Sequence, residues 1–342
     1  MTAKESENVA NAGSDTVRIG LLSTAHLHAG AYAGQLATLE GATLVGVADE
    51  DDTRGREFAA NHDVDFLDAD SLLERADGVI ICSTNVDHHG WATRAAEAGV
   101  HVLSEKPLAS DPDVAREIVD TCTEAGIHLG VAMPLRFSLP VLEAKDALEN
   151  GTVGNLQMIS GTNRGKMPGS WFVDPDASGG GAVMDHTVHI VDLVHWLTGE
   201  RVSEVYAEVG TRFHDIPVDD VNLLSMTLTD GTQFSLDGSW SRPDSWDFWG
   251  DATVSLVGTD ATIDVDCFAQ KTKFTEGGED GSGVQSLYWG DDPNGGLVAD
   301  FVEAVRNDRQ PKITGSEGVD AVAVVEAAYE SAERGEPVTV SY

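Results

Sequence analysis

The fold is decided by the apolar run Val17-Arg18-Ile19-Gly20-Leu21-Leu22 and by the turn that follows it, Ser23-Thr24-Ala25-His26-Leu27-His28. Such a run is typical of a strand that is buried on both faces of a parallel sheet. Outward from it, short apolar runs alternate with helix-length segments as far as Val131, which is the pattern of parallel βα units. The sequence therefore predicts an α/β domain with a doubly wound parallel sheet.

The elements of this first domain are predicted from apolar runs and from breaks at glycine. Strands are expected over residues 17–22, 43–48, 64–66, 78–82, 101–103 and 127–131, and helices over 28–39, 54–61, 70–76, 91–98 and 114–125. Residues 1–15 are polar and acidic, and we expect a disordered leader there rather than a secretory signal.

The pattern changes after Pro134. Helices are expected over 139–150 and 182–197, and strands over 156–161, 202–210, 221–229, 232–239, 253–258 and 261–265. Turns such as Thr229-Asp230-Gly231 are typical of hairpins. Residues 276–296 predict a long exposed loop, and helices over 297–307 and 318–334 close the chain. This half therefore predicts an α+β domain with a large, mainly antiparallel open sheet.

Composition limits the class of protein. The 342 residues are enough for two domains, and 21 Lys and Arg against 58 Asp and Glu give a net charge of -37. Such a charge repels nucleic acid and anionic membranes, and no apolar run approaches the ~18 residues of a membrane span. Cys82, Cys122 and Cys267 fit neither a disulfide framework nor a zinc motif. We expect a cytoplasmic protein without nucleic-acid or membrane partners.

The acidic residues are spread along the chain instead of forming a tail. In dilute buffer their repulsion would destabilise a compact fold, whereas a Debye length of ~3 Å at 1 M salt removes most of that cost. The composition is that of a halophilic protein, and we interpret the acidity as an adaptation to a salty cytoplasm.

The turn after the first strand lacks the glycines of a dinucleotide fingerprint, because Ser23, Ala25 and His28 take their places. Ser and Ala are small enough for a pyrophosphate to approach the backbone. Asp49 ends the second strand, where a carboxylate usually binds the ribose 2′-hydroxyl, and three more carboxylates follow it. These residues favour NAD over NADP. Two alternatives stay open: Asp49 caps a helix, or the turn belongs to a domain that binds no nucleotide.

Two motifs are the most specific features of the sequence. The first joins Ser83-Thr84-Asn85-Val86-Asp87-His88 to Ala98-Gly99-Val100-His101-Val102 and Glu105-Lys106-Pro107; the second is Ser178-Gly179-Gly180-Gly181, followed by Asp185, His189 and Asp192. With Arg136-Phe137-Ser138 at the domain junction, this pattern resembles the glucose–fructose oxidoreductase / inositol dehydrogenase (Gfo/Idh/MocA) family.

The resemblance implies a Rossmann domain over 16–133 that binds NAD, with NADP as the alternative, and a domain over 134–342 for substrate binding and oligomerisation. It implies a homodimer or homotetramer formed through the second sheet. Cofactor-binding residues are expected at Ser23, Thr24, Ala25, His26, Asp49, Ser83, Asn85, His88, Glu105 and Lys106. Catalytic residues are expected at Lys106, Asp185 and His189, and substrate-binding residues at Arg136, Asn163 and Trp171.

The catalytic assignment also has a physical basis. Lys106 follows a buried strand at the carboxyl edge of the sheet, where α/β proteins bind ligands. Asp185, His189 and Asp192 lie within about 60° of one another on a helix that is otherwise apolar, and buried polar groups of this kind are paired or functional. His186 and His195 point away from that face, and we interpret both as structural.

The sequence thus predicts an NAD(P)-dependent enzyme that oxidises a hydroxyl group of a sugar or polyol. Three alternatives remain open: a non-catalytic nucleotide-binding sensor or scaffold, an enzyme for a non-sugar substrate, and a plain core hydrogen bond between Asp185 and His189. No metal is expected, because the residues of this helix lack a third His or Cys at suitable spacing.

Overall fold

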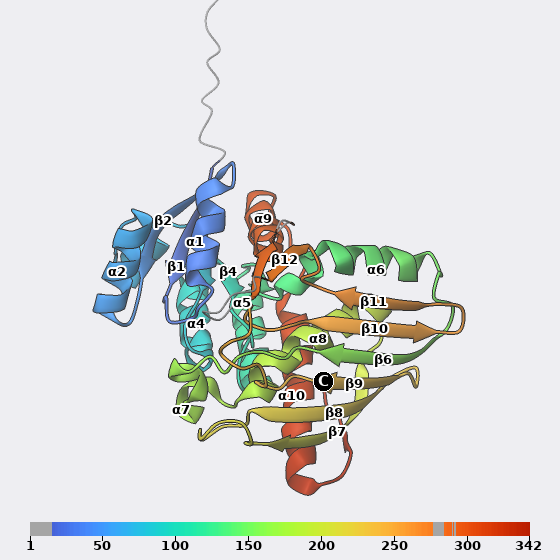
Figure 1. Cartoon of the computed structure of the whole chain (residues 1–342). Coiled ribbons are helices and arrows are strands. Elements are labelled where there is room, and N and C mark those ends of the chain that lie inside the picture. The colour runs from blue at the N-terminus through green and yellow to red at the C-terminus, as the bar shows by residue number, and fades with distance from the viewer. Residues whose placement is uncertain (1–15, 276–283, 289, 291) are drawn as a thin grey trace, which may run out of the picture.

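The computed structural model describes residues 16–275, 284–288, 290 and 292–342, so the predicted leader lies outside the described residues. The first domain holds a five-stranded parallel sheet in the order β2-β1-β3-β4-β5, with helices on both faces (Figure 1). Its elements are β1 (Val17–Leu22), α1 (Ala29–Thr38), β2 (Ala42–Ala48), α2 (Asp52–His62), α3 (Ala69–Leu73), β3 (Gly78–Ile81), α4 (His88–Glu97), β4 (His101–Ser104), α5 (Pro112–Glu124) and β5 (Leu129–Val131). The predicted doubly wound sheet is confirmed.

Local sequence explains these elements. Ile19, Leu21 and Leu22 of β1 are fully buried, as expected for a strand that helices cover on both sides. Helix α5 begins after Asp111, whose carboxylate accepts hydrogen bonds from the backbone N–H groups of Asp113 and Val114. The strand predicted over 64–66 is reduced to a single bridge between Phe66 and Val47.

The second sheet has seven strands in the order β11-β10-β6-β9-β8-β7-β14, all antiparallel except the parallel pair of β6 and β9. Helices α8 and α10 cover one face of it (Figure 1). The elements are α6 (Leu139–Glu149), β6 (Leu156–Thr162), α7 (Pro175–Ser178), α8 (Ala182–Thr198), β7 (Val202–Gly210), β8 (Val221–Leu228), β9 (Gln233–Asp237), β10 (Thr253–Gly258), β11 (Thr262–Asp266), α9 (Pro293–Arg306), α10 (Gly315–Arg334) and β14 (Val338–Thr339).

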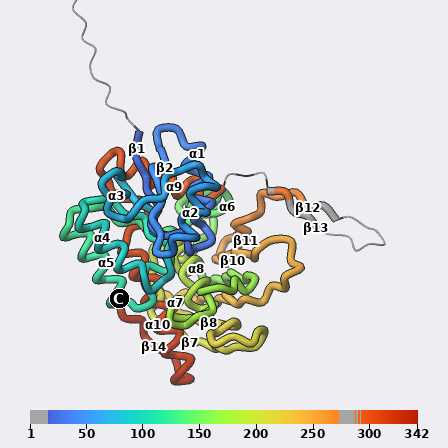
Figure 2. Tube along the Cα trace, turned by 90° about the vertical axis from the view of Figure 1, so that its left-hand side faces the viewer, coloured from blue at the N-terminus to red at the C-terminus, as the bar shows by residue number. Residues whose placement is uncertain are grey.

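The prediction of a long loop over 276–296 is wrong in part. Strand β13 (Val284–Tyr288) pairs antiparallel with β12 (Lys271–Thr275), and α9 already begins at Pro293. Figure 2 shows β12 and β13 extending away from the two large sheets. The Gly, Asp and Ser residues around it hid β13, because its five residues become a strand only by pairing with β12. The rest of the segment lies outside the described residues, apart from 290 and 292.

The last two helices complete the core of the first domain. Phe301 of α9 lies against Gly78 of β3, and Val131 of β5 lies against Gly318 of α10; a β-carbon at either glycine would fall 3.0 or 2.8 Å from its neighbour. Most buried apolar residues form one continuous cluster through both domains, and a second, small cluster holds Phe172, Ala182, Val218 and Trp240. Every helix in the described residues is too short or too polar to cross a bilayer.

Candidate active site

A cavity of about 780 Å³ lies where the carboxyl edge of the first sheet meets the second domain. It is bordered by the turn after β1, by the end of β4, by one face of α8 and by the segment around β12. The polar and charged side chains that line it are His26, His28, Lys106, Asn163, Lys166, Asp185, His186, His189, Gln270, Asp292 and Asn294, and the aromatic ones are Phe172, Phe248, Trp249 and Phe268. A cavity of this size and mixed lining is typical of a small-molecule site.

Lys106 and Asp185 form a buried ion pair in this cavity. Lys106 Nζ lies 2.5 Å from Asp185 Oδ1, and the side chain of Lys106 is only 4% exposed. Burial is the largest single influence and would raise the pKa of Asp185, but Lys106 together with His186 and His189 outweighs it, and the pKa lies below its ordinary value. The predicted catalytic Lys and Asp are therefore brought together, with opposite charges at the cavity wall.

The second carboxylate oxygen of Asp185 is held by two further groups. His186 Nε2 lies 3.2 Å from Asp185 Oδ2, and the indole N–H of Trp240 donates to the same oxygen at 3.3 Å. His186 was expected to be purely structural; it lines the cavity instead, because its ring turns toward Asp185 and its Nδ1 lies 3.0 Å from the carbonyl oxygen of Gly238. His195 does have a structural contact, since Val202 N–H donates to its Nε2.

His189 lies one turn of α8 after Asp185 and also lines the cavity. Burial, together with the nearby charge of Lys106, holds the pKa of His189 well below its ordinary value, so the imidazole is neutral at pH 7. Its Nδ1 is enclosed and has no hydrogen-bond partner among the described residues. A neutral imidazole beside a paired Lys and Asp can accept a proton from a hydroxyl group in the cavity.

Arg136 does not line the cavity, contrary to its predicted substrate contact. Its guanidinium group donates to both oxygens of Asp192, at 2.8 and 2.5 Å, and to Glu317 at 2.9 Å. Asp192 thus faces Arg136 in the interior, although it shares a helix face with Asp185 and His189. Arg136 joins the domain junction to α8 and α10.

The other two predicted substrate residues differ in position. Asn163 lines the cavity, and its amide donates to the carbonyl oxygen of Asp251 at 2.9 Å. Trp171 does not line the cavity, because its indole N–H donates to the carbonyl oxygen of Ala25 at 3.0 Å and its ring stacks on Phe172. Phe172, the neighbour of Trp171, reaches the cavity in its place.

The turn after β1 keeps the geometry of a dinucleotide fingerprint without its glycines. Ser23 has a φ of +64°, the left-handed conformation that usually calls for glycine. Helix α1 begins after His28 with no side-chain cap and no acidic residue in its first turn, so its N-terminal N–H groups suit an anion. The small Ser23 and Ala25 and this uncapped helix fit the pyrophosphate of NAD.

Asp49 and Glu50 end β2 beside this turn. The carboxylate of Asp49 is fully buried: Thr24 donates to it through both N–H and hydroxyl, and Arg54 through its guanidinium group. Glu50 is 41% exposed and accepts hydrogen bonds from Ser23 and Arg54. Of the two, Glu50 is therefore the exposed carboxylate at the end of β2, whereas the sequence predicted the ribose contact for Asp49.

The remaining predicted cofactor residues lie along the same edge of the sheet and are buried. Ser83 donates to the carbonyl oxygen of Thr84, Asn85 donates to that of Ser178, and His88 Nδ1 lies 2.9 Å from that of Pro107. Oδ1 of Asn85 has no partner among the described residues.

Sequence reasoning missed several cavity residues. The sequence singled out His28 only as the residue in place of a fingerprint glycine, yet it lines the cavity and lies against Glu105. Phe248, Trp249 and Phe268 come from connections in the second domain, where a single sequence carries no periodic signal for a cavity wall. Two aromatic residues side by side at 248–249 were the one available hint.

A doubly wound sheet with a buried Lys–Asp pair and a neutral His at its edge defines the class of two-domain, dinucleotide-dependent oxidoreductases. Residues 18–133 match the model of an oxidoreductase family with an NAD-binding Rossmann fold, and residues 141–264 match the GFO/IDH/MocA C-terminal domain. The chain belongs to the Gfo/Idh/MocA oxidoreductase family, as the sequence motifs predicted.

Relatives with assigned activities cover most of the chain. It is 26% identical to a myo-inositol 2-dehydrogenase of Thermotoga maritima over 93% of this chain and 96% of that protein. It is 28% identical to an NADP-dependent D-xylose 1-dehydrogenase of Haloferax volcanii over 77% and 80%. Among solved structures, GenD2 from gentamicin A biosynthesis, in complex with NAD, superposes with a TM-score of 0.87 at 23% identity, with complete coverage of both chains. This last likeness shows the fold.

Proposed function

We propose that this oxidoreductase oxidises a secondary hydroxyl group or a lactol hydroxyl group of a sugar or polyol, with NAD as the cofactor. The observation that carries the proposal is the cluster of Lys106, Asp185 and His189 on one wall of a cavity at the edge of the Rossmann sheet. The names of relatives that act on myo-inositol and D-xylose support a polyhydroxylated substrate.

The roles of the three side chains follow from their charges. Bound NAD supplies the acceptor for the hydride that leaves the substrate carbon. Lys106 donates a hydrogen bond to the substrate oxygen and stabilises negative charge as it develops there. His189 takes the hydroxyl proton onto Nε2, since its Nδ1 is enclosed. Asp185 fixes the ammonium group of Lys106 and balances its charge.

The test is a panel of polyols and aldoses, each with NAD and with NADP in molar KCl, read by absorbance of the reduced cofactor. We expect at least one ring polyol or aldose to reduce NAD, with the rate lowered by roughly 10²–10⁴-fold in a Lys106→Ala control. Binding of NAD without turnover of any member of the panel would instead favour a sensor or a non-sugar enzyme.

The cofactor preference is a separate expectation. Four consecutive carboxylates, Asp49 to Asp52, repel a 2′-phosphate, and Arg54 is occupied by Asp49 and Glu50. NAD should therefore bind more tightly than NADP, and Asp49→Ala should narrow the ratio of the two dissociation constants by roughly tenfold, or ~1.4 kcal/mol, because it removes a charge and releases Arg54. Glu57→Ala removes an exposed carboxylate of α2 outside this run and is the matched control. A wild-type chain that binds NADP more tightly would contradict this expectation.

The proposal extends to assembly and location. A homodimer or homotetramer would use the face of the seven-stranded sheet that α8 and α10 leave open, where Leu223 and Met158 are about half exposed. Cytoplasmic location and adaptation to high salt are parts of the same proposal, supported by the net charge of -37. Light scattering in molar KCl measures the assembly directly.

A further inference from the structure

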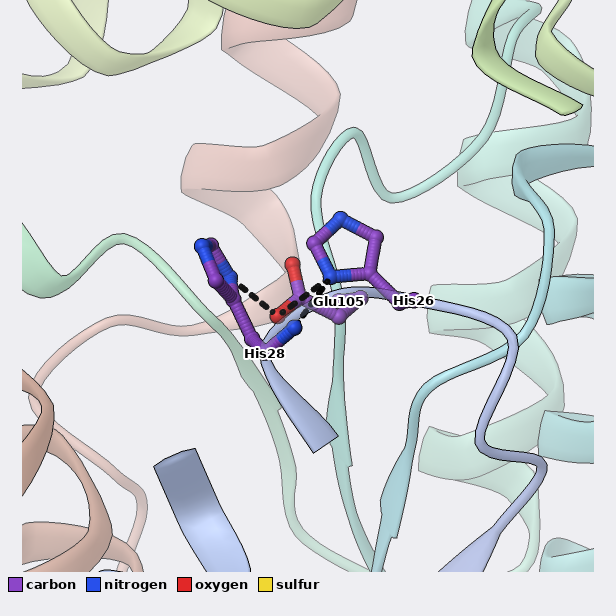
Figure 3. A group of neighbouring side chains, drawn as sticks. All are labelled: His26, His28 and Glu105. Carbon is purple, nitrogen blue, oxygen red and sulfur yellow. Dashed lines mark hydrogen bonds and ion pairs between the residues drawn. The ribbon is translucent and has the colours of Figure 1, made fainter. Parts of the chain in front are cut away.

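Three side chains converge behind the turn after β1: His26 and His28 from the turn itself, and Glu105 from the end of β4 (Figure 3). His28 Nδ1 lies 2.8 Å from Glu105 Oε1, and His26 Nδ1 lies 3.4 Å from the same oxygen. The coordinating atoms of the three residues all lie within 4.8 Å of one another. Two imidazoles and a carboxylate are thus brought to one point beside the cavity.

Glu105 is a buried carboxylate without a strong cationic partner. Its side chain is 0% exposed, and among the described residues its only ion-pair partners are the two imidazoles. The adjacent ammonium group of Lys106 is already paired with Asp185. A negative charge therefore remains at the centre of the cluster.

His26 is a buried imidazole fixed in place. Its ring packs against Trp171 and Phe172. Its Nδ1 accepts a long hydrogen bond from the backbone N–H of His28 at 3.2 Å, so this nitrogen carries no proton to donate to Glu105 Oε1, and an ion bound to it would replace that hydrogen bond. Two electron-pair donors facing each other at 3.4 Å suit a cation between them.

We propose that His26, His28 and Glu105 bind a divalent transition-metal ion of the zinc type. Zinc takes nitrogen and carboxylate ligands at about 2.0–2.2 Å in a tetrahedron, which places neighbouring ligand atoms about 3.3–3.6 Å apart. The nitrogen–oxygen separation is 3.4 Å for His26 and 2.8 Å for His28, so a small outward shift of the half-buried His28 would admit the ion. Both histidines line the cavity, so the fourth position opens toward it. These three residues differ from those of α8, for which the sequence predicted no metal. Binding of the ion does not depend on sugar oxidation.

The groups around the cluster support the three ligands. The hydroxyl of Tyr32 donates to Glu105 Oε1 at 2.5 Å, and the backbone N–H of Lys106 donates to Oε2 at 3.0 Å. Such contacts orient metal-binding carboxylates, and their loss typically weakens metal binding 10- to 100-fold. Tyr32→Phe should therefore weaken the site by roughly 10- to 100-fold without removing a ligand.

The experiment uses the full, untagged chain, stripped with a chelator and titrated with Co²⁺ and with Zn²⁺ in molar KCl. We expect one equivalent of Co²⁺ per chain, with the visible absorption of a four-coordinate ion, displaced by Zn²⁺. His28→Gln, at a half-buried position, and Glu105→Gln should abolish that absorption, with circular dichroism used to check folding. The matched control is His128→Gln, in a second group of His101, His128 and Asp308 that is more exposed.

Each result decides the proposal. Loss of the absorption in folded His28→Gln and its retention in His128→Gln would support it. Absence of a stoichiometric ion in the wild-type chain, or equal loss in the His128→Gln control, would overturn it. A chain that binds zinc but oxidises no sugar would keep this site and refute the proposed function.

Discussion

Lys106→Ala is expected to lower kcat by roughly 10²–10⁴-fold while the dissociation constant of NAD changes little. The ammonium group is 4% exposed and fixed at 2.5 Å from Asp185, so no other cation can take its place without rearrangement. His189→Ala should lose a similar factor, because it removes the neutral imidazole that accepts the hydroxyl proton. Stopped-flow or steady-state kinetics on the substrate found in the panel, with NAD binding followed by fluorescence, measures both.

Lys145→Ala is the matched control for this loss. Lys145 also contacts α8, but its ammonium group binds the carbonyl oxygen of Trp196 at the far end of the helix. Removal of the Lys145 ammonium group should lower the stability of the fold and leave kcat almost unchanged. Near-normal turnover of His189→Ala from pH 6 to 10 would remove His189 as the base and pass that role to Lys106 in its neutral form.

Arg136→Met is expected to destabilise the fold by roughly 3–5 kcal/mol, because it leaves the buried carboxylate of Asp192 without its partner. The pair is bidentate, with both side chains nearly inaccessible. Urea denaturation in molar KCl measures the loss as a shift in midpoint. The double variant Arg136→Met/Asp192→Leu removes both charges and should recover most of the lost stability, since an apolar replacement of a buried pair is often neutral.

Kinetics distinguishes the structural role of Arg136 from the substrate-binding role that the sequence predicted. Among molecules that remain folded, Arg136→Met should keep the wild-type KM, because Arg136 does not line the cavity. A raised KM with unchanged stability would instead restore Arg136 as a substrate-binding residue.

The sequence predicted elements best where one apolar run defines one strand. Val17–Leu22 and Val202–Gly210 were predicted with their observed bounds, because each run ends at a polar residue or a turn. Strand β14 escaped prediction, since two residues become a strand only by pairing with β7, far away in the chain. Helix α8 was recognised from its apolar faces, and its start is fixed by Gly181, where a β-carbon would collide with the backbone of Asp219.

The candidate site was predictable where a motif identified a residue, and not where distant segments meet. Lys106 and Asp185 were assigned separately, and the structure adds that they touch across 79 positions of sequence. The contact of His28 with Glu105 spans 77 positions, and the contact of Arg136 with Asp192 spans 56. A single sequence holds no periodic signal for such pairs. Arg136 was therefore assigned to substrate binding, although its partner Asp192 lies inside the protein.

The packing of Phe301 on Gly78 has a consequence for synthesis on the ribosome. The Rossmann sheet emerges first, but the helices that complete its core, α9 and α10, are translated last. At about 5–20 residues per second, roughly 10–30 s pass between the emergence of β5 and that of α9. During this interval an apolar surface on the nascent chain stays uncovered, so a ribosome-bound fragment ending before α9 is a natural client for chaperones, and a fragment expressed alone would aggregate.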